Sequence, residues 1–281
     1  MSSRDRVPRG LIGVVHLAPM PGDPLYSGSE AFYGVWRRAN SDAEALVAGG
    51  IDGLIVENFG STPFQKGSAG CRVPPHQLAA MSWITRELSA RFGLPLGVNC
   101  LRNDAMGALG IAAASGLGFV RVNVHTGAYV TDQGVIEGEA DSTMRYRRAL
   151  GAENVAILAD VLVKHATPLA PLSATEATHD TLDRGLADAV IVTGGATGAT
   201  VDRPLLEEVR AAAGDRPVLL GSGLTPDCAA TLAPLADGAI VGSWVKQGGE
   251  VRAPVDEARV RELVKAVRGC FRETPEGSAQ D

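Results

Sequence analysis

Polar side chains recur at the ends of short apolar runs, where they could act together on a small ligand. Glu57 follows the run 53–56, and Asp160 follows the run 155–159. Two such carboxylates could serve as general acid and base, or their oxygens could bind Mg²⁺, and the residues do not separate these uses. We predict Glu57 and Asp160 as catalytic residues; the residues single out no cofactor, and Mg²⁺ stays open.

A second set of polar residues lies within or just after other apolar runs. A charged group inside an apolar strand is costly unless it is paired or functional. Arg121 could simply pair with Glu57 or Asp160, and His16 could be a core histidine. Lys164 lies past a strand end, which favours a charge clamp on the ligand over a Schiff-base role. The further predicted catalytic residues are His16, Asn99, Arg121, Asn123, Lys164 and His165.

Glycine-rich turns follow three late apolar runs and predict an anion site. Gly221-Ser222-Gly223 and Gly242-Ser243 would let backbone N–H groups approach a phosphate closely. In barrels, the turns after strands seven and eight are the usual phosphate site. The run 193–198, with Gly194 and Gly195, could form a third wall of that site or a hinge, because glycine-rich turns serve both uses.

The apolar runs predict the strands that would position these residues. Continuous apolar runs are typical of parallel strands that are covered on both faces. Ala-rich helical patterns alternate with the runs, and eight such pairs predict one closed (β/α)8 barrel of the TIM type. An open sheet would normally show GxGxxG after its first strand, which this chain lacks. The predicted strands are 11–17, 53–56, 94–100, 119–124, 155–159, 189–192, 217–220 and 238–241.

Three connections are longer than a barrel requires, namely 58–75, 125–140 and 161–173. All three would leave carboxyl ends of strands and gather over one mouth, where such loops usually build a site. We expect one barrel over residues 1–271 and a disordered tail over 272–281. We expect the loop arginines Arg145, Arg147 and Arg148 to be solvated, and Trp36, Trp83 and Trp244 to pack helices.

Composition narrows the classes of partner. The 281 residues carry a formal net charge of -6 with mixed signs, so no basic run offers a nucleic-acid footprint. The first apolar run is too short to span a membrane, and it lacks the features of a signal peptide. We expect a cytoplasmic protein without membrane insertion. Its Ala-rich barrel exterior is consistent with a homo-oligomer.

Several motifs together resemble a known family across nearly the whole chain, to about Phe271. They are Ile12-Gly13-Val14-Val15-His16-Leu17, Glu57-Asn58-Phe59-Gly60, Val98-Asn99, Leu101-Arg102-Asn103-Asp104, Arg121-Val122-Asn123-Val124, Thr131-Asp132-Gln133-Gly134, Ala159-Asp160-Val161, Val163-Lys164-His165-Ala166, Gly221-Ser222-Gly223 and Val241-Gly242-Ser243. The chain resembles the BtpA/SgcQ family in these motifs. The resemblance implies a barrel of the ribulose-phosphate-binding type, with one branch linked to photosystem I biogenesis and another to sugar-metabolism operons.

The leading functional hypothesis is an enzyme acting on a small phosphorylated sugar or a nucleotide-like phosphoester at the barrel mouth. Isomerase, lyase and glycosidic-bond chemistry all remain open. The competing hypothesis is a non-catalytic assembly or regulatory factor that senses a phosphorylated ligand. A metal-dependent hydrolase has little support, because the chain contains no HExxH motif.

Overall fold

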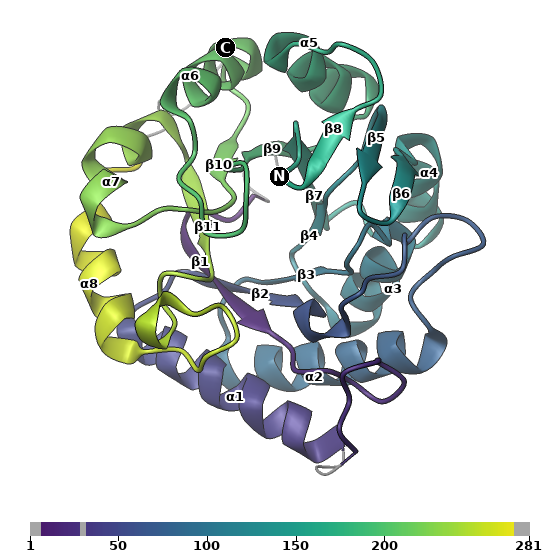
Figure 1. The fold of residues 1–281 in the computed structure, drawn as a ribbon, viewed down its shortest axis with the longest axis vertical. Helices are drawn as coiled ribbons and strands as arrows, with labels where there is room; N and C mark the ends of the chain where they lie inside the picture. The colour runs from purple at the N-terminus through teal and green to yellow at the C-terminus, as the bar shows by residue number, and fades with distance from the viewer. Residues whose placement is uncertain (1–6, 29–31, 273–281) are drawn as a thin grey trace, which may run out of the picture.

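The computed structural model describes residues 7–28 and 32–272. Its central element is a closed barrel of eight parallel strands (Figure 1), which confirms the predicted fold class. The tail predicted over 272–281 lies, from residue 273 onward, outside the described residues. The barrel strands, in their order around the ring, are β1 (Gly10–His16), β2 (Gly53–Glu57), β3 (Leu96–Asn99), β4 (Phe119–Val122), β7 (Ala156–Val161), β9 (Ala189–Val192), β10 (Val218–Leu220) and β11 (Gly238–Val241).

Helices surround the barrel as an outer ring in Figure 1. The helices over 203–213 and 257–267 bury one apolar face and expose a polar one, as the amphipathic patterns predict. The segment 174–184 divides into an α-helix, Ala174–His179, and a π-helix, Asp180–Arg184. The α-helices are α1 (Phe32–Gly49), α2 (Pro75–Phe92), α3 (Ala105–Ser115), α4 (Ala140–Ala149), α5 (Ala174–His179), α6 (Arg203–Ala213), α7 (Pro226–Leu232) and α8 (Glu257–Val267).

The barrel strands bury side chains on both of their faces. In β1, Ile12 and Val14 point into the barrel, whereas Leu11 and Val15 pack against the surrounding helices. Phe119 fills the barrel interior beside Gly97, where an added Cβ would lie 2.2 Å from the Phe119 ring. The apolar interior leaves the polar residues concentrated at the carboxyl ends of the strands.

Two of the long connections fold into a small sheet that sequence analysis did not predict. β5 (Ala128–Thr131) pairs with both β6 (Gly134–Glu137) and β8 (Ala166–Pro168) in antiparallel register. The three strands are drawn together in Figure 1. Because β8 comes from the connection after β7, this sheet joins two separate loops above the barrel.

Candidate functional site

A cavity of about 530 Å³ opens where the barrel strands end. This size suits a small-molecule ligand. Its lining residues are Val14, His16, Glu57, Phe59, Thr62, Phe64, Asn99, Leu101, Arg102, Arg121, Asn123, Asp132, Lys164, His165, Thr197, Gly198, Gly221, Ser222, Gly223, Leu224, Val241, Gly242, Ser243, Trp244 and Arg252.

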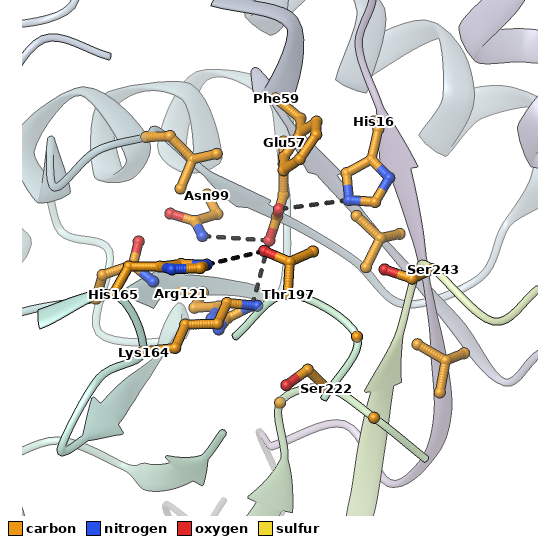
Figure 2. A pocket seen from close by; sticks show the side chains of 18 of the residues that line it. His16, Glu57, Phe59, Asn99, Arg121, Lys164, His165, Thr197, Ser222 and Ser243 are labelled. Carbon is orange, nitrogen blue, oxygen red and sulfur yellow. Dashed lines mark hydrogen bonds and ion pairs between the residues drawn. The ribbon is translucent and has the colours of Figure 1, made fainter. Parts of the chain in front are cut away.

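Strand register places three predicted site residues in one row. His16 is the partner of Glu57 in the β1–β2 pair, and Glu57 is the partner of Asn99 in the β2–β3 pair. Asn99 Nδ2 donates to Glu57 Oε1 at 3.2 Å, and His16 Nε2 lies 3.8 Å from Glu57 Oε2. Figure 2 shows the Glu57 carboxylate at the centre of these contacts. Strand pairing and these two neighbours therefore hold the Glu57 carboxylate in place at the cavity.

The Arg121 guanidinium joins Glu57 to a second carboxylate. Arg121 Nη1 donates to Glu57 Oε1 at 3.3 Å, while its Nε and Nη2 donate to Asp160 Oδ1 and Oδ2, each at 2.9 Å. Asn123 Nδ2 also donates to Asp160 Oδ2, at 3.0 Å. The Asp160 side chain is 0% exposed and does not line the cavity. Arg121 therefore lies between Asp160 and the cavity. The sequence left open whether Arg121 pairs with Glu57 or Asp160, and in the structure it pairs with both.

Burial sets the charge states in this network. Burial alone would lower the pKa of Arg121, but the Asp160 and Glu57 carboxylates outweigh it and raise that pKa. Burial, with added repulsion from Lys246 and Lys164, lowers the pKa of His16 to about 3. His16 is therefore a neutral imidazole at pH 7, and its contact with Glu57 is not an ion pair.

Lys164 and His165 enter the cavity from the connection after β7. The backbone N–H of Lys164 donates to Thr193 Oγ1 at 3.2 Å, and its carbonyl accepts from Arg102. Leu162 and His165 have positive φ angles of 47° and 57°, an uncommon conformation for residues other than glycine. Burial, followed by repulsion from Arg121, lowers the pKa of Lys164 to about 8. The turn thus presents a half-buried amine to the cavity.

His165 also connects two loops across the mouth. Its Nε2 and Thr197 Oγ1 lie 3.0 Å apart, and Figure 2 draws this contact as a dashed line between the two labelled side chains. Thr197 belongs to the connection after β9. The contact brings the predicted glycine-rich segment over the same cavity as Lys164.

Backbone corners after β10 and β11 line the opposite part of the cavity. The lining includes Gly221, Ser222 and Gly223 after β10, and Gly242 and Ser243 after β11. The N–H groups of Gly223 and Ser243 have no hydrogen-bond acceptor within the described ranges. These corners could therefore donate to an anion.

Gly194 and Gly195, which we predicted as phosphate-binding residues, do not line the cavity. The N–H of Gly194 donates to Ser222 Oγ at 3.3 Å, and an added Cβ at Gly194 would lie 2.2 Å from the carbonyl oxygen of Ala199. Gly194 thus allows its loop to fold back on itself. Gly198, later in the same run, reaches the cavity instead.

A buried ion pair holds the connection after β11. Lys246 Nζ lies 2.6 Å from Asp42 Oδ2, and Asp42 Oδ1 accepts from the N–H of Val255 at 2.9 Å. Lys246 is 0% exposed. This pair fixes the segment after Ser243 to α1, and no sequence motif marked it.

The predicted catalytic and phosphate-binding residues do not include four cavity residues with useful chemistry: Arg102, Asp132, Thr197 and Arg252. Arg102 could have been included, because it lies just after the predicted strand 94–100, where site residues of a barrel are expected. One other expectation was wrong and one was incomplete. Arg147 forms a 2.7 Å ion pair with Asp188 instead of being solvated. Trp244 packs against the hydrophobic core as expected, and it also lines the cavity.

Metal-ligand clusters and membrane-spanning helices are both absent from residues 7–28 and 32–272. Within those ranges, no group of three or more His, Cys, Asp or Glu side chains is arranged to hold a metal ion. No helix in the same ranges combines the length and apolar character needed to cross a bilayer.

Together the fold and cavity define a TIM barrel with a polar pocket at the carboxyl ends of its strands. The chain belongs to the BtpA family, whose model matches residues 8–269. It is 45% identical to the photosystem I biogenesis protein BtpA of Synechocystis sp., over 95% of this chain and 91% of that protein.

Solved structures with low sequence identity share the barrel fold. Thiamine phosphate pyrophosphorylase from Pyrococcus furiosus has a TM-score of 0.58 at 16% identity, covering 95% of this chain and 98% of its own. N-(5'-phosphoribosyl)anthranilate isomerase from Pyrococcus furiosus has a TM-score of 0.54 at 13% identity, covering 93% and 99%. These similarities establish the architecture.

Proposed function

We propose that this protein is an enzyme acting on a small phosphorylated sugar or a nucleotide-like phosphoester. One observation carries the proposal: unpaired backbone donors and the Glu57 carboxylate line the same 530 Å³ cavity. Two solved barrels of the same fold carry phosphate-containing compounds in their names, which is consistent with such a ligand.

The glycine corners would bind the phosphate and so position the rest of the substrate. Binding a group remote from the reacting atoms can supply the orientation that the chemical step needs. Gly223 and Ser243 would donate to phosphate oxygens from fixed backbone positions. The reacting end would then lie towards Glu57.

We assign proton transfer to Glu57 and a positioning role to Asp160. Glu57 lines the cavity, whereas both Asp160 oxygens accept hydrogen bonds from Arg121. Neutral His16 and Asn99 would orient substrate hydroxyl groups, and Arg121 would stabilise negative charge that develops nearby. Proton transfer of this kind is common to isomerase, lyase and glycosidic-bond chemistry.

Turnover of a defined panel tests the proposal. Ribose 5-phosphate, ribulose 5-phosphate and nucleoside monophosphates would be incubated with the wild-type protein and with Glu57→Gln, with products followed by NMR. We expect wild-type turnover of at least one compound and a loss of about 10²- to 10⁴-fold in Glu57→Gln, with calorimetric binding retained. Binding without any turnover by the wild-type protein would overturn the enzyme proposal.

The second candidate is a non-catalytic factor that senses a phosphorylated ligand. The observation that favours it is the 45% identity to a protein named for photosystem I biogenesis. Under this proposal the corners would still bind phosphate, but Glu57→Gln would change affinity rather than any rate. The same panel therefore separates the two candidates.

A further inference from the structure

Two cationic side chains line the wall of the cavity that faces away from the glycine corners. Arg102 follows β3 and Lys164 follows β7, and these strands flank β4 in the ring. The corners follow β10 and β11, on the other side of the same ring. Arg102 Nη2 donates to the carbonyl oxygen of Lys164 at 2.8 Å, so the two residues are direct neighbours.

The Arg102 turn is held rigidly by its own surroundings. Asn58 bonds Leu101 twice, donating to its carbonyl at 3.0 Å and accepting from its N–H at 2.6 Å. The N–H of Arg102 donates to the carbonyl of Gln65 at 3.0 Å. These bonds fix the backbone of the turn, and the Nη2 bond to the Lys164 carbonyl holds the side chain in place. Preorganised donors bind at lower entropic cost.

Arg102 has hydrogen-bonding capacity that the described chain does not use. The residue is 6% exposed, and its buried Nε has no hydrogen-bond partner. An unsatisfied buried donor on a charged group is costly. Because the side chain lines the cavity, a ligand atom could supply the missing acceptor.

Arg102 and Lys164 differ from Arg121 in their ion pairs. Arg121 has two carboxylate partners, Asp160 and Glu57. Neither Arg102 nor Lys164 forms an ion pair with any carboxylate in residues 7–28 and 32–272. Burial is the main cause that lowers the pKa of each, and nearby carboxylates, Asp160 among them, partly offset it. The charge of Arg102 adds a smaller repulsion that lowers the pKa of Lys164. An anion between them would relieve this repulsion.

We propose that Arg102 and Lys164 form a second anion subsite and that the substrate carries two anionic groups. The glycine corners would take the phosphate, and this subsite would take a second phosphate or a carboxylate at the other end of the molecule. The inference rests on the proposed function, because it assumes a phosphate at the corners. A bidentate or charge-assisted contact from Arg102 suits either oxyanion.

Site-resolved anion binding tests the subsite without knowledge of the substrate. Crystals of the full chain would be soaked in selenate, and anomalous maps would locate selenium in the wild type, Arg102→Met and the surface control Arg148→Met. Arg148 is 83% exposed and does not line the cavity. We expect one peak at the corners and one beside Arg102, with only the latter lost in Arg102→Met.

The outcomes distinguish the two proposals. A corner peak without a peak beside Arg102, or a second peak that persists in Arg102→Met, overturns the second subsite and leaves the proposed function standing. A peak beside Arg102 without a corner peak supports the subsite but counts against the proposed phosphate site. Loss of the second peak in Arg148→Met would also overturn the assignment to Arg102.

Calorimetry with matched probes identifies the second group. Ribulose 5-phosphate carries one anionic group, ribulose 1,5-bisphosphate carries two phosphates, and 6-phosphogluconate carries a phosphate and a carboxylate. We expect at least one of the latter two to bind about tenfold more tightly than ribulose 5-phosphate, and Arg102→Met to abolish that advantage. Equal affinity for all three probes, or an advantage that survives in Arg102→Met, would overturn the inference.

Discussion

The Arg121 guanidinium and the Asp160 carboxylate form two parallel hydrogen bonds, Nε to Oδ1 and Nη2 to Oδ2, both 2.9 Å long. The two residues lie on the neighbouring strands β4 and β7. This geometry uses the planar fork of arginine fully and leaves Nη1 directed at Glu57. Asp160 therefore determines where the positive charge of Arg121 lies relative to the cavity.

Removing the Asp160 charge should destabilise the fold. In Asp160→Asn the amide keeps one acceptor but turns a donor towards Arg121, leaving a buried cation without its main partner. We expect the free energy of unfolding to fall by about 3 kcal/mol, measured by urea denaturation. Glu207→Gln, which removes the exposed pair with Arg203, is the control and should cost less than about 1 kcal/mol. Equal losses would refute the buried-pair account.

A methyl group at Gly223 should disturb the corner after β10. Gly223 has φ +72°, and an added Cβ would lie 2.0 Å from the carbonyl oxygen of Ala199. Gly116 is a matched control, because its φ is +71° and an added Cβ would meet no atom within 4 Å. We expect Gly116→Ala to cost about 1–2 kcal/mol of unfolding free energy and Gly223→Ala clearly more. Similar losses on urea denaturation would show that the close approach to Ala199 is unimportant.

The protonation of Lys164 should make anion affinity depend on pH. Burial and the Arg121 charge lower the pKa of Lys164 to about 8, so its positive charge is present below that pH and is lost above it. Sulfate keeps a constant charge across this range and is a suitable probe. We expect calorimetric affinity for sulfate to begin falling as pH passes about 8.

Lys164→Met provides the comparison for this pH effect. The variant should bind sulfate more weakly at pH 7, and the fall near pH 8 should be absent because no titrating amine remains at that position. An unchanged pH profile in Lys164→Met would assign the effect to another group.

His16 should remain neutral through the physiological range. Burial is the largest cause that lowers its pKa to about 3, so the imidazole gains no proton between pH 9 and pH 5. We expect the NMR chemical shift of its Cε1 proton to stay constant over that interval, with His16→Gln used to assign the signal. A titration step between pH 5 and pH 8 would contradict the buried, neutral state.

The barrel could be predicted because its strands are buried on both faces, which makes each of them a continuous apolar run in the sequence. The sheet of β5, β6 and β8 could not, since it pairs segments from two separate connections and β8 has only three residues. Burial of Tyr129 and Ile136, with Val130 and Val135 exposed, is a two-residue alternation visible in hindsight. Its meaning depends on a partner strand that sequence alone does not identify.

The site could be predicted by residue type but not by role. Glu57 and Asp160 look equivalent in the sequence, as carboxylates after apolar runs. The structure shows that they differ. Arg121 on β4 binds Asp160 on β7 and keeps it out of the cavity, whereas Glu57 lines the cavity. Such a difference depends on side-chain geometry between strands, which periodicity and composition do not encode.

The antiparallel pairing of β5 with β8 has a mechanical consequence for the cavity. Thr131 is paired with Ala166 at the end of this strand pair. Asp132 follows Thr131 and His165 precedes Ala166, so both residues leave the sheet at the same end. Displacing either residue strains the same main-chain bonds. The loop after β4 and the loop after β7 are therefore expected to move together. A ligand that displaces Lys164 or His165 would also displace Asp132.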